Sequence, residues 1–149
     1  MKRVNITNAR SKDYAAVLRK IERDKVCPFC TEHFLIYHTK PIIKETKFWI
    51  LTENFRPYAG AKHHLLAVSK KHTSHFADIS AAAQIELLSL FNNELKKRKI
   101  KGGTLLMRFG YTDYTGASVG HLHAQLISGS KRGKNTEPLL TAVGNKRKH

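Results

Sequence analysis

The segment "SVGHLHAQLISG", residues 118–129, constrains the fold of this chain more than any other. In its middle, His121, His123 and Gln125 alternate with apolar residues. Successive side chains of a strand point to opposite faces of a sheet, so a strand over 119–127 would place the three polar groups on one face. A helix would scatter them around its circumference. The pattern therefore predicts a strand with chemistry on one face, against the plainer alternative of a half-exposed strand that carries histidines by chance.

Hydrophobic periodicity and turn residues predict the other elements. An amphipathic helix is expected over 11–25, because apolar residues recur at helical spacing before Pro28. A longer helix is expected over 78–99, with Asp78 or Ser80 as its N-cap. The remaining expectations are a turn at 55–62 and strands at 33–39, 47–54, 63–72, 102–110 and 116–128. Together they predict an α+β fold with about five strands, antiparallel in one sheet, and two helices.

The length and the change of composition after Gly129 predict the domain organisation. The 149 residues suit one domain. We expect this domain over 1–129, with its core at 26–129, and a loosely ordered basic tail over 130–149. No apolar run reaches the roughly 18 residues of a membrane-spanning helix, and the N-terminus lacks the apolar stretch of a signal peptide. The expected location is the cytoplasm, without a membrane partner.

The chain is strongly basic, with 27 Lys and Arg against 11 Asp and Glu and a net charge of +16. Such a surplus favours polyanionic partners, including nucleotides, polyphosphates and nucleic acid. The alternative is a basic soluble protein whose charge has no particular partner.

The only two cysteines form the pair "CPFC", Cys27 and Cys30. In a reducing compartment this spacing favours a metal site over a redox pair or two buried free thiols. Zinc in a structural site takes four ligands, often sulfur and nitrogen. Spacing alone does not choose the histidines that would complete the site; the candidates are His33, His38, His63, His64, His72, His75 and His121.

The paired histidines also suit nucleophilic chemistry. A neutral imidazole is abundant near neutral pH, and it can attack phosphorus if a hydrogen bond holds its other nitrogen. Ser118 could then donate to a phosphoryl oxygen.

Three segments together resemble the histidine triad (HIT) superfamily over roughly 26–129. "SVGHLHAQLI" resembles its His-x-His-x-His motif, with Gln125 in place of the third histidine. That substitution is similar to the branch of galactose-1-phosphate uridylyltransferase and some dinucleoside polyphosphate phosphorylases. "HHLLAVSKKH" resembles a second family segment, with Ser69 in place of proline, and "CPFC" resembles the cysteine pair of zinc-binding members. The resemblance implies a HIT-like fold and a homodimer.

The resemblance also implies roles for individual residues. His123 matches the nucleophile, and His121 and His72 match the metal ligands that complete a Cys2His2 zinc site with the cysteine pair. His64 matches a histidine close to the phosphates, and Ser118 matches a serine that contacts the phosphate or the leaving group. The implied nucleotide-binding residues are Asn54 at the ribose and Phe55 and Trp49 at the base.

These residues predict a nucleotidyl hydrolase or transferase that acts on nucleoside phosphate esters or anhydrides through a nucleotidyl-His123 intermediate. Because the amide of Gln125 cannot act as an acid near neutral pH, it favours a phosphorylated leaving group, hence nucleotidyl transfer or phosphorolysis. Two alternatives stay open. One is a nucleic-acid-binding or DNA-end deadenylating protein, motivated by the charge; the other is a non-catalytic nucleotide-binding regulator.

Overall fold

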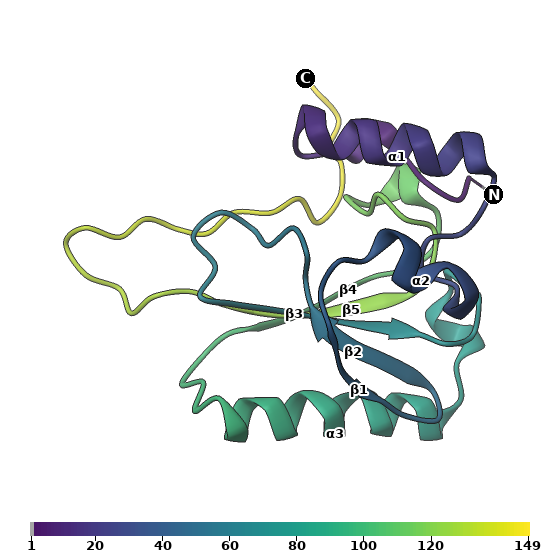
Figure 1. The fold of residues 1–149 in the computed structure, drawn as a ribbon. Helices are drawn as coiled ribbons and strands as arrows, with labels where there is room; N and C mark the ends of the chain where they lie inside the picture. Colours follow the sequence, from purple (N-terminus) through teal and green to yellow (C-terminus); the bar gives the residue numbers. More distant parts are fainter. Residues whose placement is uncertain (1) are drawn as a thin grey trace.

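A computed structural model describes residues 2–149 (Figure 1). Within this range five strands form one antiparallel sheet in the order β1-β2-β3-β5-β4. The strands are β1 (Ile42–Glu45), β2 (Trp49–Glu53), β3 (His63–Ser69), β4 (Thr104–Arg108) and β5 (His123–Ser128). The helices are α1 (Lys12–Asp24), α2 (Thr31–Tyr37) and α3 (Ala81–Lys97), with short 3-10 turns at Ile6–Asn8, Phe76–Asp78 and Thr112–Tyr114. The expected α+β architecture with a five-stranded antiparallel sheet is confirmed.

The sheet separates two hydrophobic cores. On one face α3 packs against residues that include Leu65 and Leu126; on the other face, the side of α1 and α2, the core includes Leu18, Phe34 and Leu66. The expected alternation of core-facing and polar side chains around the start of β5 is confirmed, because Leu122, Ala124 and Leu126 all belong to the α3 core. The side chains between them point to the other face.

Serine side chains cap the two long helices. Ser11 accepts a hydrogen bond from the backbone N–H of Tyr14 at the start of α1, and Ser80 accepts one from the backbone N–H of Ala83 at the start of α3. Both helices lie where the sequence predicts them. Of the two candidate caps of α3, Ser80 is the one used, since Asp78 lies in the preceding 3-10 turn.

The predicted strand at 33–39 is wrong, because this segment forms α2 and the loop after it. Phe34 is 1% exposed, whereas its neighbours Leu35 and Ile36 are 66% and 68% exposed, so burial does not alternate as a strand requires. The backbone N–H of His38 bonds to the carbonyl of Phe34 at 2.9 Å, a helical spacing. The first strand instead lies at Ile42–Glu45, and α2 makes a third helix.

The last strand begins at His123, later than the predicted strand ranges of 116–128 and 119–127. The residues before it form a loop that pairs with the N-terminal segment. Asn5 N–H bonds to the carbonyl of Ser118, and the N–H of Gly120 bonds to the carbonyl of Arg3, both at 2.8 Å. A Cβ at Gly120 would lie 2.6 Å from the carbonyl oxygen of Lys2, so this close approach requires glycine.

Residues 130–149 contain no helix or strand. Part of this segment lies along the domain, where the carbonyl of Ala142 accepts hydrogen bonds from Arg108, and Asn145 donates to the carbonyl of Asp113 at 3.1 Å. Among residues 2–149, no helix is both long and apolar enough to span a bilayer.

Candidate active site and metal centre

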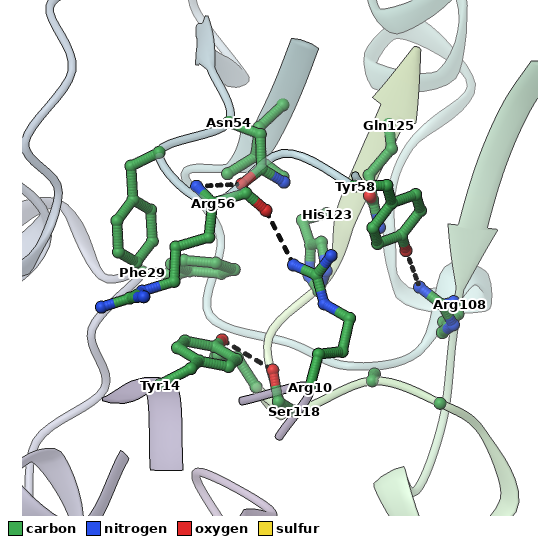
Figure 2. A pocket seen from close by; sticks show the side chains of 15 residues that line it. Arg10, Tyr14, Phe29, Asn54, Arg56, Tyr58, Arg108, Ser118, His123 and Gln125 are labelled. Atoms are coloured by element: carbon green, nitrogen blue, oxygen red, sulfur yellow. Dashed lines mark hydrogen bonds between the residues drawn. The ribbon is translucent and has the colours of Figure 1, made fainter. Parts of the chain in front are cut away.

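A polar pocket lies on the α1 and α2 side of the sheet, above the start of β5 (Figure 2). Strand pairing places His123 opposite Val68 and Gln125 opposite Leu66, both of which belong to the core on this side. Fifteen residues line the pocket: Arg10, Tyr14, Phe29, Asn54, Phe55, Arg56, Tyr58, Leu66, Arg108, Gly116, Ala117, Ser118, Val119, His123 and Gln125.

His123 has the geometry of a nucleophile. Its Nδ1 lies 2.7 Å from the carbonyl oxygen of His121, which can only accept, so Nδ1 carries the proton and Nε2 keeps a free lone pair. Its ring packs in a T-shaped contact with Phe29 at a centroid distance of 5.0 Å. Burial lowers the pKa of His123 to about 4, and the Arg108 charge adds to this against the opposing hydrogen bond to His121. The imidazole is therefore neutral at pH 7 and available for attack.

The amide of Gln125 is oriented by a hydrogen-bond chain. The backbone N–H of Tyr58 donates to Nδ1 of His64 at 3.0 Å, so a neutral His64 carries its proton on Nε2. This Nε2–H donates to Oε1 of Gln125 at 2.6 Å. The amide nitrogen of Gln125 is thus left as a donor for the pocket. His64 is 3% exposed and is not among the residues that line the pocket, so its contact with the pocket is made through Gln125.

Ser118 and Tyr14 share a hydrogen bond of 2.7 Å between their hydroxyl groups, in which either can donate. Burial raises the pKa of Tyr14, which keeps its phenol protonated at neutral pH against the opposing hydrogen bond to Ser118. When Tyr14 accepts, the Ser118 proton is used within the pair; when Tyr14 donates, the serine hydroxyl can point its proton into the pocket.

Two of the three residues expected at the nucleotide line the pocket. Asn54 accepts the backbone N–H of Arg56 through Oδ1 at 2.9 Å, and Phe55 stands edge-on to Tyr14 at 6.4 Å. Trp49 is placed elsewhere. It is fully buried in the α3 core on the opposite face of the sheet, where its Nε1–H donates to the carbonyl of Ala83 at 2.8 Å. Its expected place at the base is corrected to a core position.

Three arginines in the pocket were not expected from the sequence. Arg10 precedes α1, Arg56 follows β2 and Arg108 ends β4. The sequence around each arginine does not predict a place in a pocket, because the three segments are far apart in the chain and meet only in the folded structure.

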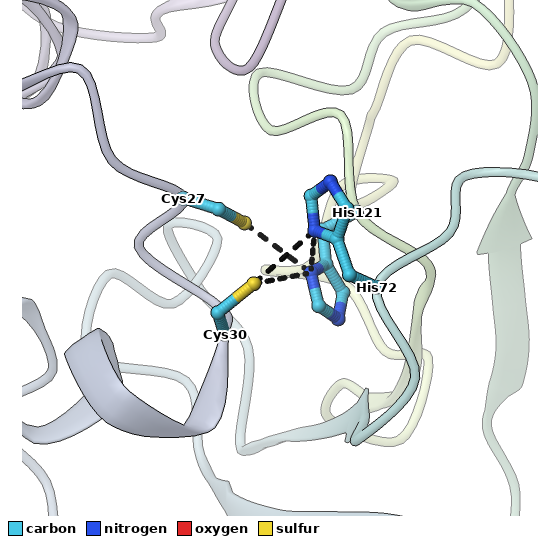
Figure 3. A group of neighbouring side chains, drawn as sticks. All are labelled: Cys27, Cys30, His72 and His121. Carbon is cyan, nitrogen blue, oxygen red and sulfur yellow. Dashed lines mark hydrogen bonds between the residues drawn. The ribbon is translucent and has the colours of Figure 1, made fainter.

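Two cysteines and two histidines form a second cluster (Figure 3). The potential ligand atoms of Cys27, Cys30, His72 and His121 all lie within 4.8 Å of one another. Among the four atoms, Cys27 Sγ to His121 Nδ1, Cys30 Sγ to His72 Nδ1 and His72 Nδ1 to His121 Nδ1 are each 3.2 Å apart. This group could hold a metal ion.

The donor set and its surroundings fit a tetrahedral cation. Thiolate and imidazole are the donors of structural zinc sites, and ligand bonds of about 2.0 to 2.3 Å place neighbouring donors about 3.3 to 3.8 Å apart. Nε2 of His121 lies 2.6 Å from the carbonyl of Ser69, which makes Nε2 the protonated nitrogen and turns the lone pair of Nδ1 toward the cluster. Burial, with Cys27 beside it, raises the pKa of Cys30 to about 12, so a cation is needed to stabilise the thiolate.

Solved structures of HIT proteins share this fold. A HIT-like protein is 26% identical, with a TM-score of 0.52 over 62% of this chain and 89% of its own. A HIT family hydrolase from Clostridium thermocellum is 22% identical, with a TM-score of 0.52 over 80% and 94% of the two chains. A zinc-bound histidine triad family protein from Mycobacterium smegmatis is 16% identical, with a TM-score of 0.53 over 72% and 79%.

No protein-family model and no curated protein sequence matches the chain. The fold is therefore established by structural likeness: the chain has the HIT-like α+β fold.

Proposed function

We propose that the protein is a HIT-type nucleotidyl hydrolase or transferase that forms a covalent intermediate on His123. The observation that carries the proposal is the environment of this ring. A buried, neutral imidazole is held through Nδ1 by the carbonyl of His121, and Nε2 makes no hydrogen bond within residues 2–149. Ser118 and Gln125 line the same pocket, which contains no carboxylate among its described lining residues. The solved hydrolase of the same fold adds support from a different protein.

In the proposed reaction, Nε2 of His123 attacks the phosphorus of a nucleoside phosphate ester or anhydride. The N–P bond forms as the bond from phosphorus to the leaving group breaks, and the leaving group departs with the electron pair. The amide N–H of Gln125 and the hydroxyl of Ser118 would donate to the phosphoryl oxygens, where negative charge develops. Water or a phosphorylated acceptor then attacks phosphorus, and the electron pair of the N–P bond returns to Nε2.

We propose zinc for the Cys2His2 cluster. Bound there, zinc would supply a structural cross-link and no chemical step. Cys27 and Cys30 precede α2, His72 follows β3 and His121 precedes β5, so these ligands come from separate parts of the fold. The carbonyl of His121 also accepts from His123. Holding His121 in place therefore positions the proposed nucleophile.

Steady-state kinetics on a substrate panel test the proposal. The panel contains adenosine phosphoramidate, dinucleoside polyphosphates, nucleotide sugars and adenylated DNA, each with and without inorganic phosphate or hexose phosphate. The wild type should turn over at least one of them, and His123→Asn should lose that activity while keeping its circular dichroism spectrum and unfolding midpoint. Full activity in a folded His123→Asn protein contradicts the covalent mechanism.

The charge favours a second candidate, a protein that acts at nucleic-acid ends. Its motivation is the net charge of +16. Preferred turnover of adenylated DNA, with steep salt dependence, would select this candidate; binding of nucleotides without any turnover would select a regulator instead. The homodimer and the cytoplasmic location stay predictions.

A further inference from the structure

The arginine cluster of the pocket consists of Arg10, Arg56 and Arg108. All three line the pocket that contains His123, yet none belongs to a segment that suggested the proposed function. Figure 2 shows Arg10 in front of His123, with Arg108 beyond Tyr58 on one side and Arg56 on the other.

Tyr58 joins two of the three guanidinium groups. Cζ of Arg10 lies 4.4 Å from the centroid of the Tyr58 ring, a cation–π contact. Nη1 of Arg108 donates to the Tyr58 hydroxyl oxygen at 3.3 Å. Tyr58 itself is 7% exposed and its ring packs on His64 at 4.6 Å. His64 in turn donates to the amide oxygen of Gln125. Tyr58 therefore contacts both the guanidinium groups of Arg10 and Arg108 and the histidine that orients Gln125.

No carboxylate neutralises the cluster within the part of the chain that the structure describes. None of the lining residues is acidic, and the ion pairs of residues 2–149 involve other side chains. The acceptors that the cluster does contact are neutral: Arg10 donates to the carbonyl of Arg56 at 2.8 Å, and Arg108 donates to Thr141 Oγ1 at 2.9 Å and to the carbonyl of Ala142. Nε of Arg56 is buried without a hydrogen-bond partner.

This arrangement is electrostatically unfavourable without an anion. Burial lowers the pKa of Arg10 first, and the neighbouring Arg108 and Arg56 charges lower it further, against opposing effects of Tyr58 and Tyr14. The charges of the cluster also act on the hydrogen-bond chain behind Gln125: burial lowers the pKa of His64, and the Arg10 and Arg108 charges lower it further, against the opposing hydrogen bond to Gln125. An anion among the guanidinium groups would turn this repulsion into attraction, and fork-shaped donors suit phosphate oxygens.

We propose that the arginine cluster is a subsite for an anionic leaving group, a phosphate or longer phosphoryl chain beyond the phosphorus that His123 attacks. This inference rests on the proposed function and narrows its substrates to phosphoanhydrides. As the N–P bond forms, the P–O bond to the leaving phosphate breaks, and that phosphate departs with the electron pair and needs no proton. The arginines stabilise its growing charge. This role agrees with the amide of Gln125, which cannot supply a proton as an acid.

Binding of inorganic probes tests the subsite without requiring turnover. Isothermal titration calorimetry at fixed ionic strength compares pyrophosphate with orthophosphate on the full chain. The variants are Arg10→Gln and Arg108→Gln, and the matched control is Arg19→Gln, because Arg19 lies exposed on α1 and outside the pocket. We expect the wild type to prefer pyrophosphate, each pocket variant to weaken its binding about tenfold, and the control to stay within about twofold.

The result that overturns the proposal is equal pyrophosphate binding by all four proteins, or an equal loss in Arg19→Gln, because binding would then report only the overall positive charge. Circular dichroism of each variant verifies folding. Arg10→Lys supplies a second test: it keeps the charge but lacks the forked donors, so it should bind pyrophosphate more tightly than Arg10→Gln and less tightly than the wild type. Equal binding by Arg10→Lys and Arg10→Gln would contradict an electrostatic role for Arg10.

Kinetics then separate the subsite from the proposed function. The ratio of kcat/KM for diadenosine tetraphosphate to kcat/KM for adenosine phosphoramidate should fall about tenfold in Arg10→Gln and Arg108→Gln, because only the tetraphosphate has an anionic leaving group. An unchanged ratio refutes the leaving-group role. If the wild type turns over no member of the panel, the proposed function fails, while the pyrophosphate titration still decides whether the cluster binds phosphate.

Discussion

Replacing Gln125 by glutamate changes one functional group with almost no change of shape. Oε1 of Gln125 accepts from Nε2–H of His64 at 2.6 Å, and the amide nitrogen is the part left to donate into the pocket. In Gln125→Glu the contact with His64 can persist, but a carboxylate oxygen replaces the donor. The variant therefore tests whether that N–H group stabilises the phosphoryl oxygens.

The expected loss of catalytic activity in Gln125→Glu is large for so small a change in structure. Removing one preorganised donor from a developing oxyanion costs about 10²–10³ in kcat, or about 2.7 to 4 kcal/mol. Repulsion between the carboxylate and the phosphoryl oxygens adds to this loss. We therefore expect kcat/KM of Gln125→Glu to fall at least about 100-fold near neutral pH.

The pH dependence of the variant gives a second test. Gln125 is 5% exposed, and burial raises the pKa of a carboxyl group, against the opposing effects of the Nε2–H of His64 and of the arginines that line the same pocket. As pH falls, protonation gives the introduced carboxyl group an O–H donor, so the activity of the variant should recover relative to the wild type.

The assay is kcat/KM on the best panel substrate across pH, with urea unfolding of the same proteins. Gln84→Glu is the matched control, because Gln84 lies on α3, which covers the opposite face of the sheet. Activity of Gln125→Glu within about threefold of the wild type at neutral pH, with no relative gain at lower pH, would refute the assigned donor role.

Three further predictions concern the metal, the pH dependence of stability and the tail. Cys30→Ser should lose stoichiometric zinc by mass spectrometry of the metal and unfold about 10 °C lower or more, because metal ligation contributes several kcal/mol and each kcal/mol is worth about 2–4 °C at this length; unchanged zinc content would contradict the site. Burial, and then the Lys40 charge, lowers the pKa of His38 to about 4. At this histidine the unfolded chain therefore binds more protons than the folded chain as pH falls from about 6.5 to about 4. In urea unfolding, this difference should lower the free energy of unfolding by up to about 3 kcal/mol over that range, and the decrease should be smaller by that amount in His38→Phe. Deleting residues 130–149 should leave a cooperative thermal transition, since that segment has no helix or strand; an unfolded product would show that the tail belongs to the domain.

The local sequence pattern predicted the structure correctly where the apolar residues of a single helix or strand show which of its side chains are buried. The alternation along 122–126 predicts which side chains of β5 enter the α3 core, and the structure agrees. The two long helices carry serine caps and apolar faces of their own. In contrast, α2 contains adjacent apolar residues of which only Phe34 is buried, so composition alone could not distinguish it from a strand.

The parts of the site that the sequence did not predict depend on contacts between distant segments. Trp49 and His123 both belong to strands. Whether their side chains lie on the same face of the sheet depends on the register from β2 through β3 to β5, which the sequence alone does not give. The arginine cluster joins positions 10, 56 and 108, and nothing in their local sequences marks a common pocket. The histidines of the metal cluster likewise could not be chosen by spacing; the resemblance proposed His72 and His121, and the fold brings both to the cysteine pair.

Intact-protein mass spectrometry tests the covalent intermediate most directly. The wild type and His123→Asn are mixed with each panel substrate, quenched within seconds without acid, which would cleave a phosphoramidate bond, and weighed. The account predicts a mass increase of one nucleotidyl group on the wild type alone, which disappears when water or phosphate completes the reaction. Turnover by the wild type without an adduct at any time point, or an equal adduct on His123→Asn, would contradict it.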